Sequence, residues 1–311
     1  MLTFPAALDI DRDSRAPYRP YTAVVSRIVE LSPGFRRVTF VSSDFRFFAP
    51  HGLDQRIKLM FPLPGAGASD LGADDDHCMM TGGWFEKWRA LPDAKRSPIR
   101  TFTVRGIRPE LNELDVDFQW HGDGGPAAQW LATASLGDNI VIVGPDARSE
   151  TSTAGIDWRP GAARDLLLVG DGTSAPAICS IVESLPTGVR AQAFILVPTA
   201  ADAQDVVSRA DADVTWMTGD IDGAVRAWGE STLHGVRTPS ATDLRSLSSD
   251  DDDAMPWSSP ASSAGEVYAW VAGESTLVKR LRRLLVGELG LDRSSVAFMG
   301  YWRRGASEGQ A

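Results

Sequence analysis

The sequence predicts two domains, a six-stranded antiparallel β-barrel followed by an α/β domain with a doubly wound parallel sheet. The length of 311 residues suits two domains of ordinary size. Short runs rich in β-branched residues, separated by turn residues, fill the first half and favour a small barrel. In the second half, apolar strands alternate with helical patterns, which favours a parallel sheet with helices on both faces. We place the two domains at residues 15–150 and 164–305.

Six runs in the first half carry the pattern of strands. In Gln55–Phe61, charged and apolar residues alternate with the period of two that a half-buried strand requires. One helix is expected from Gly125–Pro126 to about Thr133, since proline suits the first helical position. Residues 66–97 form a long irregular segment that Trp84 and Trp88 hold to the body. The predicted strands are Thr22–Leu31, Phe35–Val41, Gln55–Phe61, Ile99–Arg105, Glu113–Trp120 and Asn139–Val143.

In the second half, the continuous apolar run Asp165–Val169 predicts a buried strand that leads through a glycine turn into a helix over about Ala175–Leu185. A second helix is expected over Glu274–Gly287, where leucines recur at helical spacing, and a helical stretch near Ala200–Ser208. The other predicted strands are Gln192–Val197, Asp213–Met217, Val267–Val271 and Val296–Met299. Residues 151–164 have a linker composition, and the Ser- and Asp-rich residues 238–264 predict a flexible inserted loop.

The overall composition excludes several classes of protein. A net charge of -10 argues against nucleic acid or anionic lipid as a partner. The two cysteines form no CxxC pair and the four histidines no HxxxH pattern, so no metal site held by the protein is expected. The first residues lack a basic leader, and no apolar run approaches the roughly 18–20 residues of a membrane helix. We therefore expect a cytoplasmic protein without a membrane span.

The run from Arg100 to Arg105 combines groups that suit a flavin. Alternation puts Arg100 and Phe102 on one face of the strand, and Thr101 and Thr103 on the other. Arginine pairs with pyrophosphate, an aromatic ring packs on the flavin or its ribityl chain, and hydroxyl groups bond polar edges. An ordinary barrel strand at a sheet edge is the alternative interpretation.

Two glycine-rich turns resemble phosphate-binding sites, because each precedes a predicted helix whose first N–H groups are free to meet an anion. The first runs from His121 through Gly125, Pro126 and Ala127. The second follows an apolar strand and contains Gly170, Asp171, Thr173 and Ala175; it lacks the GxGxxG spacing of a dinucleotide fingerprint. Structural turns of similar composition remain the alternative for both.

The order of five segments along the chain resembles that of the siderophore-interacting proteins, which are FAD-dependent ferric-siderophore reductases of the ferredoxin–NADP reductase superfamily. The resemblance extends from about Tyr21 to Gly305. The five segments are RTFTVR, DVDFQWHGDGGPAAQW, LLLVGDGTSAPAI, WVAGES and GYWRRG.

The resemblance implies roles for the matching positions. Arg100, Thr101, Phe102 and Thr103 fall on the first flavin motif, where the arginine meets the FAD phosphates and Thr103 lies near flavin N5. The second FAD motif has His121, Gly125, Pro126 and Ala127, and the nicotinamide-nucleotide side has Gly170, Asp171, Thr173, Ala175, Gly273 and Glu274. Basic residues are implied to bind the anionic ferric siderophore, namely Lys58, Arg148, Arg303 and Arg304. Together with Thr103, we expect Lys58, Arg303 and Arg304 to serve the reaction itself.

Two positions depart from the family pattern. The family usually has tyrosine where this chain has Phe102, and the missing hydroxyl costs a hydrogen bond of roughly 0.5–1.5 kcal/mol. It usually has glutamate where Gly172 stands, which weakens the expectation of nucleotide contacts there.

The function implied is the transfer of electrons from NADPH or NADH through FAD to a ferric siderophore, which releases the iron as Fe(II). A flavin suits this task because a hydride carries two electrons and Fe(III) accepts one at a time. One alternative keeps the flavin but uses another acceptor, or takes electrons from ferredoxin. A further alternative is a siderophore-binding protein without turnover.

Overall fold

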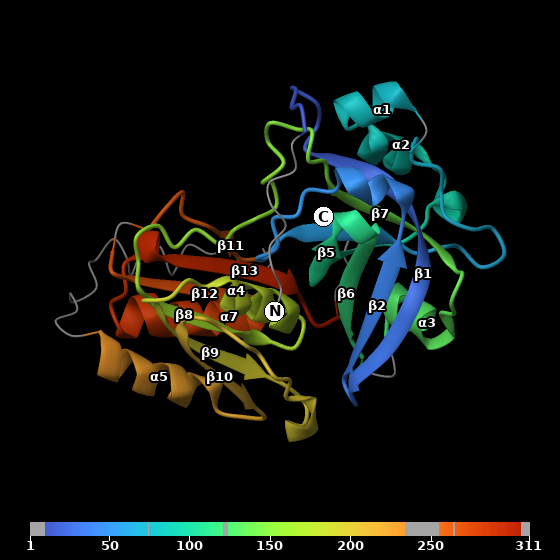
Figure 1. Ribbon diagram of the computed structural model, residues 1–311. Helices are drawn as coiled ribbons and strands as arrows, with labels where there is room; N and C mark the ends of the chain where they lie inside the picture. Colours follow the sequence, from blue (N-terminus) through green and yellow to red (C-terminus); the bar gives the residue numbers. More distant parts are fainter. Residues whose placement is uncertain (1–9, 74, 121–123, 234–254, 264, 306–311) are drawn as a thin grey trace. The chain divides into compact units, whose positions relative to one another are not determined.

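The computed structural model describes residues 10–73, 75–120, 124–233, 255–263 and 265–305 (Figure 1). The chain divides between Ile156 and Asp157 into two compact units. Each unit is built around one sheet. In the described part of the chain, no helix combines the length and the apolar character needed to cross a membrane.

The first unit contains a seven-stranded sheet in the order β4-β3-β7-β1-β2-β6-β5. All neighbouring strands are antiparallel. The strands are β1 Tyr18–Ser32, β2 Phe35–Val41, β3 Arg56–Met60, β4 Ile99–Thr103, β5 Gly106–Arg108, β6 Glu113–Gln119 and β7 Asn139–Pro145.

The predicted six-stranded barrel is corrected to this curled seven-stranded sheet. The run predicted as one strand, Ile99–Arg105, is interrupted after Thr103, because the chain changes its pairing partner there. β4 pairs with β3, whereas the N–H of Arg105 donates to the carbonyl of Asp115 on β6 at 2.9 Å and β5 continues along β6. The two edge strands are therefore separated by only two residues of chain, and this short connection makes the sheet curl.

Alternate residues of the strands form the apolar core inside the curl. Tyr21, Phe40 and Leu59 are fully buried there. The helix α3 (Pro126–Thr133) adds Trp130, whose ring lies 5.7 Å from that of Phe118 and 5.6 Å from that of Phe61. Burying side chains of this size stabilises the fold by roughly 1.5–3 kcal/mol each.

Residues 66–97 are less irregular than predicted, because they contain two short helices, α1 (Asp76–Thr81) and α2 (Trp84–Ala90). The side chain of Asp75 caps α1 by accepting from the N–H of Cys78 at 3.1 Å. Trp84 and Trp88 pack on a second apolar cluster. This cluster lies on the face of the sheet away from the main core and consists of Met60, Leu71, Ile99 and Val143.

The second unit contains a six-stranded sheet in the order β10-β9-β8-β12-β13-β11. The first five strands are parallel, and β11 pairs antiparallel with β13 at the edge. The strands are β8 Asp165–Asp171, β9 Arg190–Leu196, β10 Asp211–Met217, β11 Trp257–Ser258, β12 Val267–Glu274 and β13 Val296–Trp302.

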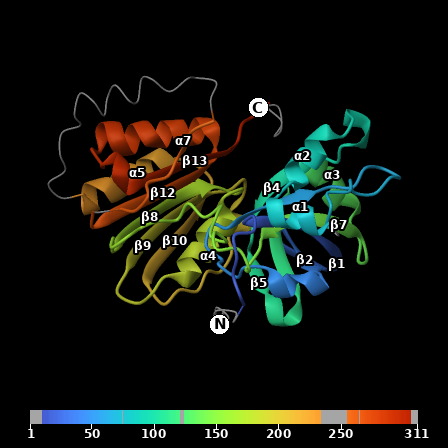
Figure 2. The same cartoon turned by 90° about the horizontal axis from the view of Figure 1, so that it is seen from above.

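Helices cover both faces of the parallel sheet, as the doubly wound prediction requires. α4 (Ala175–Ser184) lies on one face, and α5 (Ile221–Thr232) and α7 (Ser275–Arg282) lie on the other (Figure 2). α7 continues as a π-helical turn over Arg283–Glu288. The core under α5 and α7 includes Leu167, Val271 and Leu281.

Three expectations for the second unit need correction. The sheet is mixed, since β11 adds an antiparallel edge. β11 also lies within residues 238–264, so Trp257–Ser258 of the predicted loop form a short strand; residues 238–254 and 264 fall outside the described residues. Of the helical stretch near Ala200–Ser208, only a 3-10 turn over Ala200–Asp202 forms, where Thr199 and Asp202 make a capping box.

Candidate functional site

In the first unit, β3 and β4 bring a lysine and two threonines together on one face of the sheet. Lys58 lies opposite Thr101, and its Nζ donates to Thr101 Oγ1 at 3.0 Å. Thr103 lies two residues further along β4, opposite Arg56, and is 6 % exposed. Because side chains alternate along a strand, Lys58, Thr101 and Thr103 share the face away from the aromatic core.

Arg100 and Phe102 occupy the other face of β4. The ring of Phe102 packs against that of Phe118 with centroids 4.5 Å apart, and against that of Phe61 at 6.3 Å. Nη1 of Arg100 donates to the carbonyl of Ile99 at 2.7 Å. Phe102 is thus anchored in the protein core while remaining half-buried.

The guanidinium of Arg100 lies at the beginning of α3. Nη2 of Arg100 is 4.0 Å from the point that a Cβ on Gly125 would occupy. Gly125 is the N-cap of α3 and has no side chain to cap it, and Pro126 begins the helix. The first N–H groups of a helix carry partial positive charge. The fold therefore places one fixed positive charge beside these helix N–H groups.

This arrangement fits the diphosphate of FAD. An arginine and a helix N-terminus are two groups that bind phosphate oxygens, and they come from two segments distant in sequence. Gly124 and Gly125 are exposed and have no side chain to block an approaching ligand. His121, which was expected beside these residues, lies outside the described residues.

Arg148, also predicted to bind substrate, is engaged by a carboxylate. Its Nε and Nη2 donate to the two carboxylate oxygens of Asp146 at 2.9 and 2.7 Å. The guanidinium carbon also lies 4.2 Å from the ring centroid of Phe47. The positive charge of Arg148 is therefore offset locally, and an anion gains less from it than from a solvated arginine.

In the second unit, the predicted nucleotide residues gather where the order of the sheet reverses. The chain passes from β8 to β9 in one direction along the sheet, and from β12 to β13 in the other. In open α/β sheets, ligands bind at the carboxyl ends of the strands at such a point. Gly170 and Asp171 lie at the end of β8, and Gly273 and Glu274 at the end of β12.

The turn after β8 is too tight for a larger residue at Gly170. A Cβ there would collide with Ser174 Oγ and with the carbonyl of Ala272. Ala175 follows as the first residue of α4 and is buried. Gly170 therefore leaves room for the tight turn at the point where β8 pairs with Ala272 of β12.

The carboxylate of Asp171 is a centre of hydrogen bonding. Oδ1 accepts from the N–H of Thr173 at 2.9 Å and from Thr173 Oγ1 at 2.5 Å. Oδ2 accepts from the N–H of Glu274 at 2.7 Å and from Trp302 Nε1 at 2.9 Å. The structure thus brings Asp171, Thr173 and Glu274 together, as expected from their common place in the predicted site.

Glu274 caps the following helix. Its Oε2 accepts from the N–H groups of Thr276 at 2.6 Å and Leu277 at 3.2 Å, and its Oε1 accepts from the N–H of Arg304 at 3.3 Å. Burial raises the pKa of Glu274, but backbone hydrogen bonds from Arg304, Leu277 and Thr276 outweigh this effect and lower the pKa below its ordinary value.

Trp302 was not among the predicted site residues, although it directly precedes the predicted Arg303 and Arg304. Its indole reaches Asp171, while Arg303 is half-buried and Arg304 is exposed. The run of two aromatics and two arginines singled out this segment. Its connection to Asp171 depends on strand pairing, which the segment alone does not encode.

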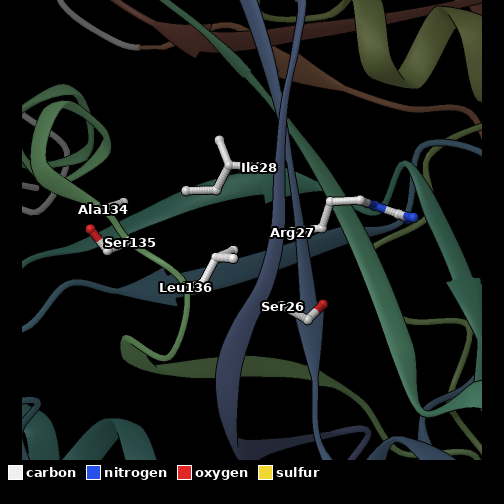
Figure 3. Close-up of a pocket in the computed structure, with 6 residues that line it drawn as sticks. All are labelled: Ser26, Arg27, Ile28, Ala134, Ser135 and Leu136. Carbon is white, nitrogen blue, oxygen red and sulfur yellow. The ribbon is translucent and has the colours of Figure 1, made fainter.

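A separate depression of about 510 Å³ lies in the first unit (Figure 3). Ile28 and Leu136 face each other across it, while Arg27 is directed away. No predicted site residue lines it, and it offers no cluster of charged groups. The lining residues are Ser26, Arg27, Ile28, Ala134, Ser135 and Leu136.

Among the residues that the structure describes, no three His, Cys, Asp or Glu side chains come together as ligands for a metal ion. The donors that do meet are the guanidinium of Arg100 and the first N–H groups of α3, which suit anions.

Comparison with known proteins assigns both units. The profile of the siderophore-interacting FAD-binding domain matches residues 24–149, and that of the siderophore-interacting protein family matches residues 163–305. The ferric vibriobactin reductase ViuB of Vibrio cholerae is 26 % identical over 89 % of this chain and 87 % of its own length. The NADPH-dependent ferric-chelate reductase of Escherichia coli is 26 % identical over 89 % of this chain and 91 % of its own.

Solved structures agree with these matches. The siderophore-interacting protein SipS from Aeromonas hydrophila superposes with a TM-score of 0.64 and 29 % identity, covering 93 % of this chain and 94 % of its own. The ferredoxin reductase of carbazole 1,9a-dioxygenase superposes with a TM-score of 0.57 at 15 % identity, covering 92 % of this chain and 70 % of its own, which shows a shared fold.

Proposed function

We propose that this chain, which belongs to the siderophore-interacting protein family, is an FAD-dependent reductase that passes electrons from NAD(P)H to ferric siderophores. The family match covers an FAD-binding domain, and relatives along nearly the whole chain are named ferric reductases. The observation that carries the proposal is the meeting of Arg100 with the beginning of α3.

We assign FAD to the first unit and the nicotinamide nucleotide to the second. Arg100 and the N–H groups around Pro126 and Ala127 would hold the FAD diphosphate. Phe102 would support the flavin end, since its ring is fixed by Phe118 and cannot turn away without breaking the aromatic core. Thr103, which we propose to lie near flavin N5, has its hydroxyl on the face of β4 opposite Phe102.

When bound, FAD takes two electrons from a hydride donor and delivers them singly to Fe(III). The protein supplies the binding sites and the electrostatic field for this exchange. The ferric siderophore is the substrate, and its iron leaves as Fe(II), which siderophores hold far more weakly. No metal site of the protein is needed.

An anionic ferric siderophore must overcome the net charge of -10. Cationic side chains are therefore required, and we assign this role to Lys58 of the first unit and to Arg303 and Arg304 of the second. Lys58 is held by its hydrogen bond to Thr101, so its charge stays on the same face of the sheet as Thr103. Arg148 is a weaker candidate, because Asp146 already occupies its guanidinium.

The switch point of the second sheet is the proposed site of NADPH or NADH. Gly170 keeps the turn after β8 tight, and α4 directs its N-terminus toward this edge of the sheet. The Escherichia coli relative is named an NADPH-dependent reductase, which makes NADPH the donor to test first.

Anaerobic turnover tests the proposal. The FAD-loaded protein is mixed with NADPH or NADH, a ferric siderophore and a coloured Fe(II) trap. We expect Fe(II) to accumulate only when the protein is present. Flavin reduction without Fe(II) would leave an oxidoreductase with another acceptor. A flavin that neither nucleotide reduces would refute NAD(P)H as the donor, and reduction by ferredoxin would then identify the alternative electron source. A protein that binds the siderophore without turnover under any donor would be a binding protein.

A further inference from the structure

Two carboxylates at the switch point accept hydrogen bonds from the C-terminal segment as well as from the nucleotide turn. We propose that Asp171 and Glu274 are positioning residues that clamp the segment Trp302–Arg304, and that they serve the ferric siderophore through its two arginines. This inference rests on the proposed function, because it needs Arg303 and Arg304 to bind an anionic chelate.

The first step concerns the capacity of the Asp171 carboxylate to accept hydrogen bonds, which is already used. An ionised carboxylate offers about four lone-pair positions. Four donors occupy them, namely the N–H and the hydroxyl of Thr173, the N–H of Glu274 and the indole of Trp302. Asp171 is only 9 % exposed. Its carboxylate therefore has little capacity left to accept a hydrogen bond from a ribose hydroxyl, and its role is structural toward its neighbours.

The second step is the direction of Trp302. β12 and β13 pair as parallel strands, with Gly273 opposite Gly300 but Glu274 opposite Trp302. The register therefore shifts by one residue at Tyr301. Such an irregularity changes the direction of the following side chains. Here it accompanies an indole whose N–H reaches across to the carboxylate at the end of β8.

The third step is the second point of attachment. Oε2 of Glu274 caps α7, while Oε1 accepts from the backbone N–H of Arg304. The residue between the two attachments is Arg303. Its main chain is thus held on one side by the Trp302 side chain and on the other by the Arg304 N–H.

The consequence concerns the cost of binding. An arginine whose main chain is not fixed loses both backbone and side-chain freedom when it binds an anion. Fixing the main chain beforehand removes part of this loss. The two acids would therefore raise the affinity for an anionic chelate even though carboxylates repel anions, because their charges are already shared among N–H donors.

The test uses the gallium(III) complex of a tris-catecholate siderophore, which is shaped like the ferric complex and is not reduced by flavin. It is titrated against FAD-loaded protein, and NADP⁺ is titrated separately. Trp302→Phe removes one attachment, and Glu274→Gln weakens the other because an amide has one acceptor oxygen. We expect each variant to bind the gallium complex about two- to tenfold more weakly, as for the loss of one hydrogen bond, and we expect Trp302→Phe to leave NADP⁺ affinity unchanged.

Matched controls come from the same unit. Asp165→Asn alters the opposite end of β8, where Asp165 pairs with Arg190, and Glu288→Gln alters a surface pair with Arg226. Neither should change the affinity for the gallium complex. In a background with Arg303→Gln and Arg304→Gln, Trp302→Phe and Glu274→Gln should lose their effect, because the clamp would then have no arginine to position.

A second readout does not depend on any ligand. The indole N–H resonance of Trp302, assigned as the signal lost in Trp302→Phe, should shift in Asp171→Asn and stay in place in Asp165→Asn. A loss of NADP⁺ affinity with unchanged gallium-complex affinity would overturn the inference in favour of direct nucleotide binding. Equal binding of the gallium complex by wild type and both clamp variants would also overturn it. If the wild-type protein does not bind the gallium complex at all, the result refutes the ferric siderophore as the substrate, and so the proposed function and not the clamp alone.

Discussion

Replacing Gly273 by alanine should damage the switch point more than any ordinary glycine substitution. Gly273 has a φ of +138°, which L side chains rarely adopt. A Cβ at this position would lie 2.8 Å from both Cγ and Oδ2 of Asp171, and 3.0 Å from its Oδ1. The carboxylate cannot retreat without lengthening its bonds to Thr173, Glu274 and Trp302.

The magnitude follows from two contributions. Holding a non-glycine residue in this backbone conformation costs about 1–3 kcal/mol. Displacing a carboxylate that accepts four hydrogen bonds costs roughly a further 2–3 kcal/mol if two of them are lost. We therefore expect Gly273→Ala to lower the free energy of unfolding by about 3–6 kcal/mol, a large share of the stability of an ordinary domain.

Urea unfolding of Gly273→Ala measures this loss against a matched control. Gly188 lies in the same unit with a φ of +81°, and a Cβ there would meet only Arg164 Nη1 at 3.7 Å. Gly188→Ala should cost only about 1–2 kcal/mol, for the left-handed backbone alone. Equal unfolding midpoints for the two variants would refute the argument, because they would show that Asp171 moves aside freely.

Three other perturbations have definite expected outcomes. Arg100→Gln should weaken FAD binding by at least about tenfold, since a charged hydrogen bond contributes about 1.5–3 kcal/mol. Fluorescence titration of the apoprotein with FAD measures this affinity. An unchanged affinity would show that Arg100 does not bind the diphosphate. Lys58→Ala should raise KM for an anionic ferric siderophore several-fold and leave the FAD spectrum intact, whereas unchanged kinetics would remove Lys58 from the site. Burial raises the pKa of Asp115, but hydrogen bonds from Arg108 and Thr39 outweigh this effect and lower the pKa below its ordinary value. The ionised carboxylate therefore stabilises the fold at pH values above its unfolded pKa of about 3.9. This stabilisation is lost as the pH falls through the folded pKa. The difference in unfolding free energy between wild type and Asp115→Asn should therefore shrink between pH 7 and pH 3, and a constant difference would contradict this account.

Local patterns were sufficient for much of the fold. Period-two alternation predicted β3, and apolar runs predicted β8 and β12, because burial of one or both faces dictates these patterns directly. The helix α3 was predicted from Pro126, since proline is tolerated at a helix start. The two-part organisation and the family resemblance followed from the order of such segments.

These local patterns did not predict the shortest strands. β5 has three residues and β11 has two, and each forms because a neighbouring strand of the sheet, β6 or β13, offers backbone groups to pair with. The chain leaves β3 for β6 after Val104, a change of partner that the composition of Ile99–Arg105 does not reveal. β11 follows a Ser- and Asp-rich segment, and its pairing with Met299 and Phe298 depends on the exposed edge of β13.

Residue types in the sequence determined which chemistry is available: an arginine and a glycine-rich helix start for a diphosphate, a tight glycine turn for a nucleotide, and basic residues for an anionic chelate. Only the tertiary structure decided how those residues are used. Arg148 pairs with Asp146, and the carboxylate of Asp171 accepts hydrogen bonds from residues at the ends of three strands. Strand register and chain crossings bring those groups within hydrogen-bonding distance. Hydrogen bonds act over about 3 Å, whereas the partners of Asp171 are separated by up to 131 residues along the chain, so their pairing is a property of the fold alone.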